Sequence, residues 1–163
     1  MDPVAALREI FADDQEIRVN LDANGLIRVV EADVRQDLLD VKIRRIAFKD
    51  DKAFPPTDVR YVPRDAMWAI LSKPEVSAFM RDHEIVRRFD FEDASGRRPI
   101  PSPELPHLSE SLNDVSLSQA LDNVLQTFPG LWIYENCPSK NGKRVVDFGI
   151  YKNGPMWSVP SRQ

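Results

Sequence analysis

Residues 115–134 read VSLSQALDNVLQTFPGLWIY, and they carry the clearest structural pattern in the chain. Ser116 and Gln119 have the spacing of a capping box, which predicts that a helix begins just after Ser116. Apolar residues then recur at the spacing of an amphipathic helix: Leu117, Ala120, Leu121, Val124, Leu125 and Phe128. The proline and glycine at residues 129–130 end this helix, and residues 131–134 form a strand.

The sequence on both sides of this helix predicts a compact second lobe. A strand is expected immediately before the helix, and residues 145–151 are expected to form an antiparallel strand after it. The polar residues 135–144 then form the connecting loop. Residues 107–151 are therefore predicted to be a βαββ lobe, followed by a tail at residues 152–163 that has no apolar period and is expected on the surface.

A first lobe is predicted over residues 1–91, beginning with a helix and a hairpin. Asp2 is expected to cap a helix that continues to Ala12, because proline follows it at the first helical position. Residues 17–21 alternate between apolar and polar, and residues 26–30 resume extended character after an Asn-Gly pair, which predicts a hairpin.

The next strand of the first lobe is expected at residues 39–48. Its apolar positions change parity after Ile43, so a bulge at Arg44 or Arg45 would keep Ile46 on the same face. A short strand is expected at residues 59–61.

Two consecutive helices follow, at residues 64–71 and 73–82, separated by a kink where Ser72 and Glu75 have the spacing of a capping box. Residues 85–91 are expected to form a strand. The proline-rich residues 92–106 form a linker or lid, because prolines cannot donate the hydrogen bonds of a sheet. The two lobes are expected to pack together, and the predicted class is α+β with antiparallel sheets and a kinked helix pair.

The helix and the strands beside it resemble the secretin and TonB short N-terminal domain, over residues 112–151. The residues that match the pattern of this family are Val115, Ser116, Leu117, Ala120, Leu121, Val124, Leu125, Gly130, Leu131 and Ile133. The chain differs from the family in its Phe-Pro pair before the glycine. The resemblance implies a small interaction module of the bacterial cell envelope, and it supplies no catalytic residues.

The composition excludes a membrane-spanning protein and a scaffold held together by disulfides. The chain has 163 residues, a formal net charge of −4, a single cysteine and no apolar stretch of membrane-spanning length. Nucleic acid is a minor alternative, because the arginine pairs at 44–45, 87–88 and 97–98 are balanced by many carboxylates. The first residues lack the pattern of a signal peptide, which predicts a cytoplasmic protein, or a periplasmic one if a leader was removed.

Few residues offer catalytic chemistry. His83 is expected at a helix C-terminus, His107 in a surface loop and Cys137 in a hairpin loop. An enzyme that uses Cys137 or the two histidines is therefore an alternative to a binding protein. The chain contains no glycine-rich phosphate motif and no grouped metal ligands, so no cofactor and no metal are expected.

The terminal hairpin is the predicted partner site. Trp132 and Tyr134 alternate with Leu131 and Ile133, so one of these pairs faces away from the helix. We expect Trp132, Tyr134 and Tyr151 to be exposed anchors for a protein partner, unless the first lobe or the proline-rich segment covers them. The polar rim of this site is expected to be Lys140, Lys143 and Arg144, and an edge strand of the hairpin would also allow a homo-oligomer. The predicted function is thus a non-catalytic protein interaction or adaptor module.

Overall fold

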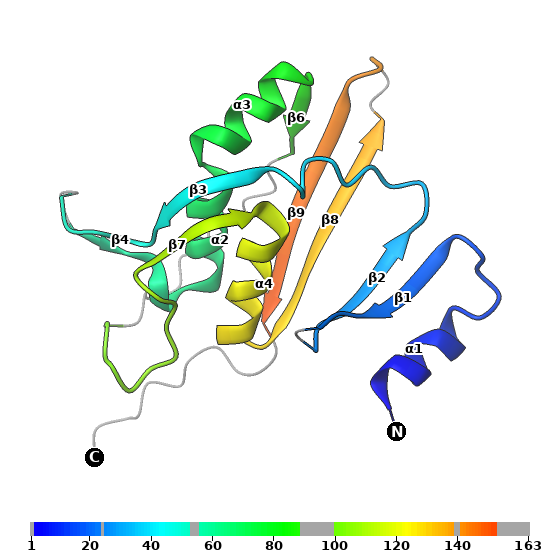
Figure 1. Ribbon diagram of the computed structural model, residues 1–163, viewed down its shortest axis with the longest axis horizontal. Coiled ribbons are helices and arrows are strands. Elements are labelled where there is room, and N and C mark those ends of the chain that lie inside the picture. The colour runs from blue at the N-terminus through cyan, green and yellow to red at the C-terminus, as the bar shows by residue number, and fades with distance from the viewer. Residues whose placement is uncertain (1, 24, 53–55, 89–99, 139–140, 153–163) are drawn as a thin grey trace. The chain divides into compact units, whose positions relative to one another are not determined.

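The protein is described by a computed structural model, in which residues 2–23, 25–52, 56–88, 100–138 and 141–152 are placed (Figure 1). Its contacts divide the chain into two units, Met1–Gln36 and Asp37–Gln163. Helices and largely antiparallel sheets confirm the predicted α+β class.

The first unit contains a helix and a hairpin, as predicted. Helix α1 spans Pro3–Ile10, where the Asp2 carboxylate accepts a hydrogen bond from the Val4 amide at 3.0 Å. Strands β1 (Ile17–Leu21) and β2 (Ile27–Glu31) pair antiparallel. The helix ends two residues before the expected boundary at Ala12.

The second unit contains the remaining elements. They are β3 (Lys42–Ala47), β4 (Lys49–Asp50), β5 (Thr57–Asp58), the 3₁₀-helix η1 (Val59–Tyr61), α2 (Pro63–Leu71), α3 (Pro74–Asp82), β6 (Ile85–Arg87), β7 (Ser111–Ser116), α4 (Leu117–Thr127), β8 (Gly130–Pro138) and β9 (Arg144–Lys152). Strand β3 pairs antiparallel with β7, and β4 with β5. The third sheet has the order β6-β9-β8, in which β6 is parallel to β9 and β8 is antiparallel to it.

These pairings join residues from both sides of the proline-rich segment. Strands β3 and β6 come before that segment, and their partners β7 and β9 come after it. The two predicted lobes therefore share sheets, and the division by contacts falls after Gln36 instead. Residues 100–106 contain no helix or strand, as expected, whereas residues 89–99 and the tail at 153–163 lie outside the described residues.

The parity change in β3 does occur, but its predicted cause is wrong. Ile43 and Ile46 are both buried, yet the register from Ile43↔Val115 to Arg45↔Asn113 is continuous, so neither strand has an extra residue. The ladder instead omits the pair of Arg44 and Asp114, where the backbone of Asp114 leaves the extended conformation with a φ of 52°. This irregularity leaves Arg44 and Arg45 both exposed.

Two local predictions near the helix pair are also wrong. The kink between α2 and α3 is present, but Ser72 does not cap α3. Pro74 occupies the first helical position and makes Lys73 the N-cap, so the Glu75 carboxylate is available to accept a hydrogen bond from the Arg44 amide at 3.2 Å. Residues 59–61 form η1 and not a strand, because the Asp58 carboxylate accepts from the Arg60 amide and caps a helical turn.

Helix α4 is central to the hydrophobic core, as its sequence predicted. The capping box is present: the Ser116 hydroxyl accepts from the Gln119 amide at 3.2 Å, and the Gln119 side chain accepts from the Ser116 amide at 2.8 Å. Its buried residues pack with residues of α2, α3, β3 and β9 in one cluster. Figure 1 shows α4 beside β8 and β9, so that one face of the β6-β9-β8 sheet lies toward the core.

Candidate functional site

Side chains of β8 alternate between the two faces of the β6-β9-β8 sheet. The inner face packs against the core and includes Trp132, Tyr134, Phe148 and Ile150. The opposite face, which we call the outer face, carries the exposed residues Leu131 (48% exposed), Ile133 (39%), Tyr151 (60%) and Val86 (48%). The described residues therefore leave an apolar surface on one side of this sheet.

The expectation that Trp132 and Tyr134 are exposed anchors is wrong. The Trp132 indole nitrogen donates a hydrogen bond of 3.0 Å to the Asp122 carboxylate, which is buried in α4. The Tyr134 ring lies 5.1 Å from the Phe148 ring, and burial raises the pKa of the Tyr134 phenol. Both side chains thus pack against the core, whereas Tyr151 is exposed as predicted.

Leu131 and Ile133 replace them as the accessible apolar residues of β8. In the antiparallel register Leu131 lies opposite Tyr151, and Ile133 lies opposite Gly149. A Cβ at Gly149 would be only 2.9 Å from the Tyr151 ring, so that ring lies over the glycine. The ring and the two aliphatic side chains therefore form one contiguous apolar group. Sequence alternation predicted these two faces of β8 but not which of them would face the helix.

An acidic pair lies next to this apolar group. Glu135 of β8 and Asp147 of β9 are directly opposite in the register, and both belong to the outer face. The next pair along the strands is Cys137 opposite Val145, and Val145 also pairs with Val86 of β6. We call the pair of Glu135 and Asp147 the acidic row. On the outer face it lies between two apolar rows.

The predicted basic rim is only partly present. Lys143 is exposed near the start of β9, and Lys140 lies outside the described residues. Arg144 is on the inner side, where its guanidinium makes two hydrogen bonds of 2.8 and 2.6 Å to the Asp37 carboxylate. These bonds raise the pKa of Arg144 and fasten the start of the second unit to β9. Arg144 is therefore a structural residue and not a rim residue.

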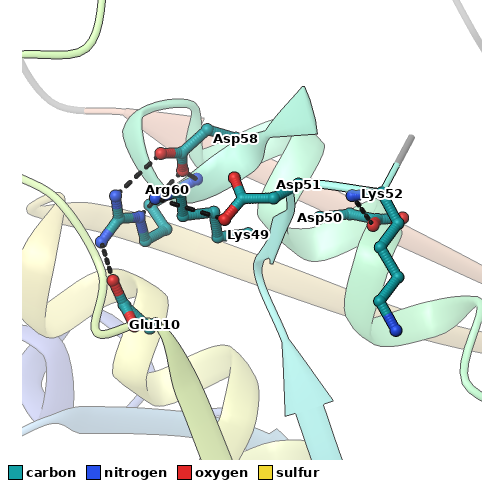
Figure 2. A network of polar contacts seen from close by, with 7 residues as sticks. All are labelled: Lys49, Asp50, Asp51, Lys52, Asp58, Arg60 and Glu110. Carbon is teal, nitrogen blue, oxygen red and sulfur yellow. Dashed lines mark hydrogen bonds and ion pairs between the residues drawn. The ribbon is translucent and has the colours of Figure 1, made fainter. Parts of the chain in front are cut away.

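A separate polar network lies around β5 (Figure 2). The Asp58 carboxylate accepts hydrogen bonds of 2.9 and 2.8 Å from the Arg60 guanidinium, which is also 3.6 Å from the Glu110 carboxylate. Nearby, the Lys49 ammonium is 3.5 Å from the Asp51 carboxylate. These ion pairs connect η1 to the segment that precedes β7, and they lower the pKa of Asp58 chiefly through its hydrogen bonds with Arg60. The network has a structural role and presents no nucleophile.

The residues considered for catalysis lie on separate elements. His83 is the C-cap of α3, which confirms its predicted place at a helix C-terminus, and its ring stacks on that of Phe79 at 3.9 Å. His107 is exposed in a loop, with its ring 5.2 Å from that of Tyr61. Cys137 is exposed on β8 and not in the hairpin loop. Among the described residues, no group of three or more histidines, cysteines and carboxylates could hold a metal ion.

The arginine pairs differ in their exposure, and only the pair at 44–45 has both members exposed among the described residues. Arg87 is partly buried, with its guanidinium 4.4 Å from the centre of the Trp68 ring, whereas Arg88 is exposed. The pair at 97–98 lies outside the described residues. Among the placed helices, none is long and apolar enough to cross a membrane.

Comparisons with family models, with curated proteins and with solved structures found no match to this chain.

Proposed function

We propose that this chain is a non-catalytic protein interaction module that binds a protein partner through the outer face of the β6-β9-β8 sheet. The observation that carries this proposal is the exposed apolar group of Leu131, Ile133 and Tyr151 on adjacent strands. Large apolar and aromatic side chains in a contiguous exposed patch are typical of surfaces that bind other proteins.

The positions of the polar residues support binding over catalysis. His83 caps a helix, Arg144 holds Asp37, and Asp58 holds Arg60, so each has a structural use. An enzyme of the acyl-transfer type needs a nucleophile within hydrogen-bond reach of a base. The Cys137 thiol is on β8, whereas the two histidine rings lie against Phe79 and Tyr61, so the contacts of the described residues bring neither ring to the thiol and favour binding as the main activity.

The resemblance to the secretin and TonB short N-terminal domain extends the proposal to a compartment. The order β7, α4, β8 and β9 agrees with the strand, helix and strand of that pattern. On this basis we propose an adaptor role in the bacterial cell envelope.

The experiment is site-specific photo-crosslinking in the native host. A photoreactive phenylalanine derivative replaces Tyr151, and the crosslinked products are identified by mass spectrometry. We expect a discrete crosslinked protein, and we expect Ile133→Asp to abolish that product because the new charge would be buried in the interface.

Ile100→Asp is the matched control, since Ile100 is 86% exposed and lies outside the sheet. It should leave the crosslink intact. A product of twice the chain mass would identify the partner as a second copy. The proposal is wrong if no discrete product forms, or if both aspartate variants reduce the product equally.

A further inference from the structure

The acidic row of the outer face indicates which charge a partner would bring to this surface. Glu135 and Asp147 are directly opposite each other on neighbouring antiparallel strands. Like charges in such a pair destabilise a sheet, because their side chains lie close together on one face. The pair therefore costs the isolated chain stability, and a cation placed between the two carboxylates would remove that cost.

The residues around the acidic row indicate that this positive charge belongs to a side chain of the partner. Leu131 and Ile133 lie on one side of the acidic row, and Cys137 lies on the other side along β8. A partner that covers the apolar residues also removes water from the two carboxylates between them. Desolvated carboxylates need a positive partner, so the covering surface must bring a lysine or an arginine to this row.

The dimensions of the outer face fit an α-helix. The three rows from Leu131 to Glu135 consist of β8 and β9 alone, because β6 pairs with β9 only at Arg144–Val146. Two strands about 4.8 Å apart form a strip narrower than a helix with its side chains, which is about 10 Å across, so one helix covers the strip. Successive rows along β8 are about 6.8 Å apart, and residues four apart on a helix advance about 6 Å. One helix lying along β8 can therefore place one side chain on each row.

We propose that the partner docks on the outer face through an amphipathic helix with apolar side chains at positions i and i+4 and a lysine or arginine at i+8. The basic side chain lies between Glu135 and Asp147, and the apolar ones cover Leu131, Ile133 and Tyr151. This inference rests on the proposed function, because it names the chemistry of the partner at the same surface.

The test uses synthetic helical peptides as probes and the full chain labelled with ¹⁵N. The first peptide has an alanine-rich helical background with two leucines four residues apart and a lysine four residues further on. The second has glutamate in place of that lysine. The third carries the same three side chains at every second position in a strand-forming background. Binding is followed through the amide resonances of β8 and β9 at low ionic strength.

We expect the lysine peptide to bind at least tenfold more tightly than the glutamate peptide. The double variant Glu135→Gln/Asp147→Asn should remove this discrimination and should melt at an equal or higher temperature than the unmodified chain. Glu104→Gln/Asp40→Asn makes the same change in net charge at exposed positions outside the sheet, and it should preserve the discrimination.

Three results would overturn the inference: no helical peptide binds, the lysine and glutamate peptides bind equally, or the strand-forming peptide binds more tightly than the helical one. If one of these occurs while the Tyr151 crosslink still forms and is lost in Ile133→Asp, the helical partner is wrong but the proposed function stands. If the crosslink also fails, both are wrong.

Discussion

Replacing Trp132 with phenylalanine tests the assignment of the inner face. The substitution keeps an aromatic ring in the core but removes the indole N–H that donates to Asp122 at 3.0 Å. Asp122 is only 5% exposed, so water cannot readily replace the lost donor. A hydrogen bond to a charged group contributes about 1.5–3 kcal/mol, and we therefore expect the free energy of unfolding to fall by about 2 kcal/mol.

The assay is urea denaturation followed by circular dichroism, with Trp68→Phe as the matched control. Trp68 is 38% exposed on α2, and phenylalanine keeps a ring under the Arg87 guanidinium at this position, so the replacement should change the free energy of unfolding by less than about 1 kcal/mol. In an Asp122→Asn background the Trp132→Phe substitution should cost only about 1 kcal/mol, as for a bond between neutral groups. The reasoning is refuted if Trp132→Phe lies within about 0.5 kcal/mol of the unmodified chain, or if its cost is the same in both backgrounds.

Three further predictions follow from particular backbone and side-chain positions. Arg60 lowers the pKa of Asp58, so the stability that this pair contributes, about 1 kcal/mol, is present at neutral pH and lost as the pH falls below about 4; Asp58→Asn should flatten this part of a pH-dependent melting curve. Glu84 follows the C-cap of α3 with a φ of 52°, so Glu84→Gly should raise the free energy of unfolding by about 0.5–1 kcal/mol, and Glu84→Ala should not. Gly149→Ala should displace the exposed Tyr151 ring and shift its NMR resonances, while the free energy of unfolding changes by less than about 0.5 kcal/mol.

Local signals in the sequence predicted most of the helices. The capping box at Ser116 and the proline after Asp2 both involve atoms within three residues of one another, so their geometry is written in the sequence itself. The prediction at Ser72 failed because a second local signal competes with it: Pro74 occupies the first helical position and makes Lys73 the N-cap. Two competing local signals cannot be ranked without the energy of the rest of the fold.

Features that depend on distant residues were not predictable from local patterns. The irregularity at Arg44 involves Asp114 on another strand and Glu75 on a helix, so no spacing along one segment indicates it. The pairing of β6 with β9 likewise joins segments that are more than fifty residues apart. For the candidate site, alternation in β8 defined two faces, but only the position of Asp122 on α4 decided that Trp132 lies inside.

The composition of β8 contains a signal that the alternation rule misses. Residues 131–134 are all apolar, although a strand that is covered on one face alternates between apolar and polar residues, and a continuous apolar run is typical of a strand covered on both faces. In the described part of the second unit, the core covers only the inner face of this run. Leu131 and Ile133 are therefore residues of the type found in a covered strand, yet they are exposed. The protein partner that we propose would resolve this conflict, and the acidic row beside these residues favours a partner that is basic at that point.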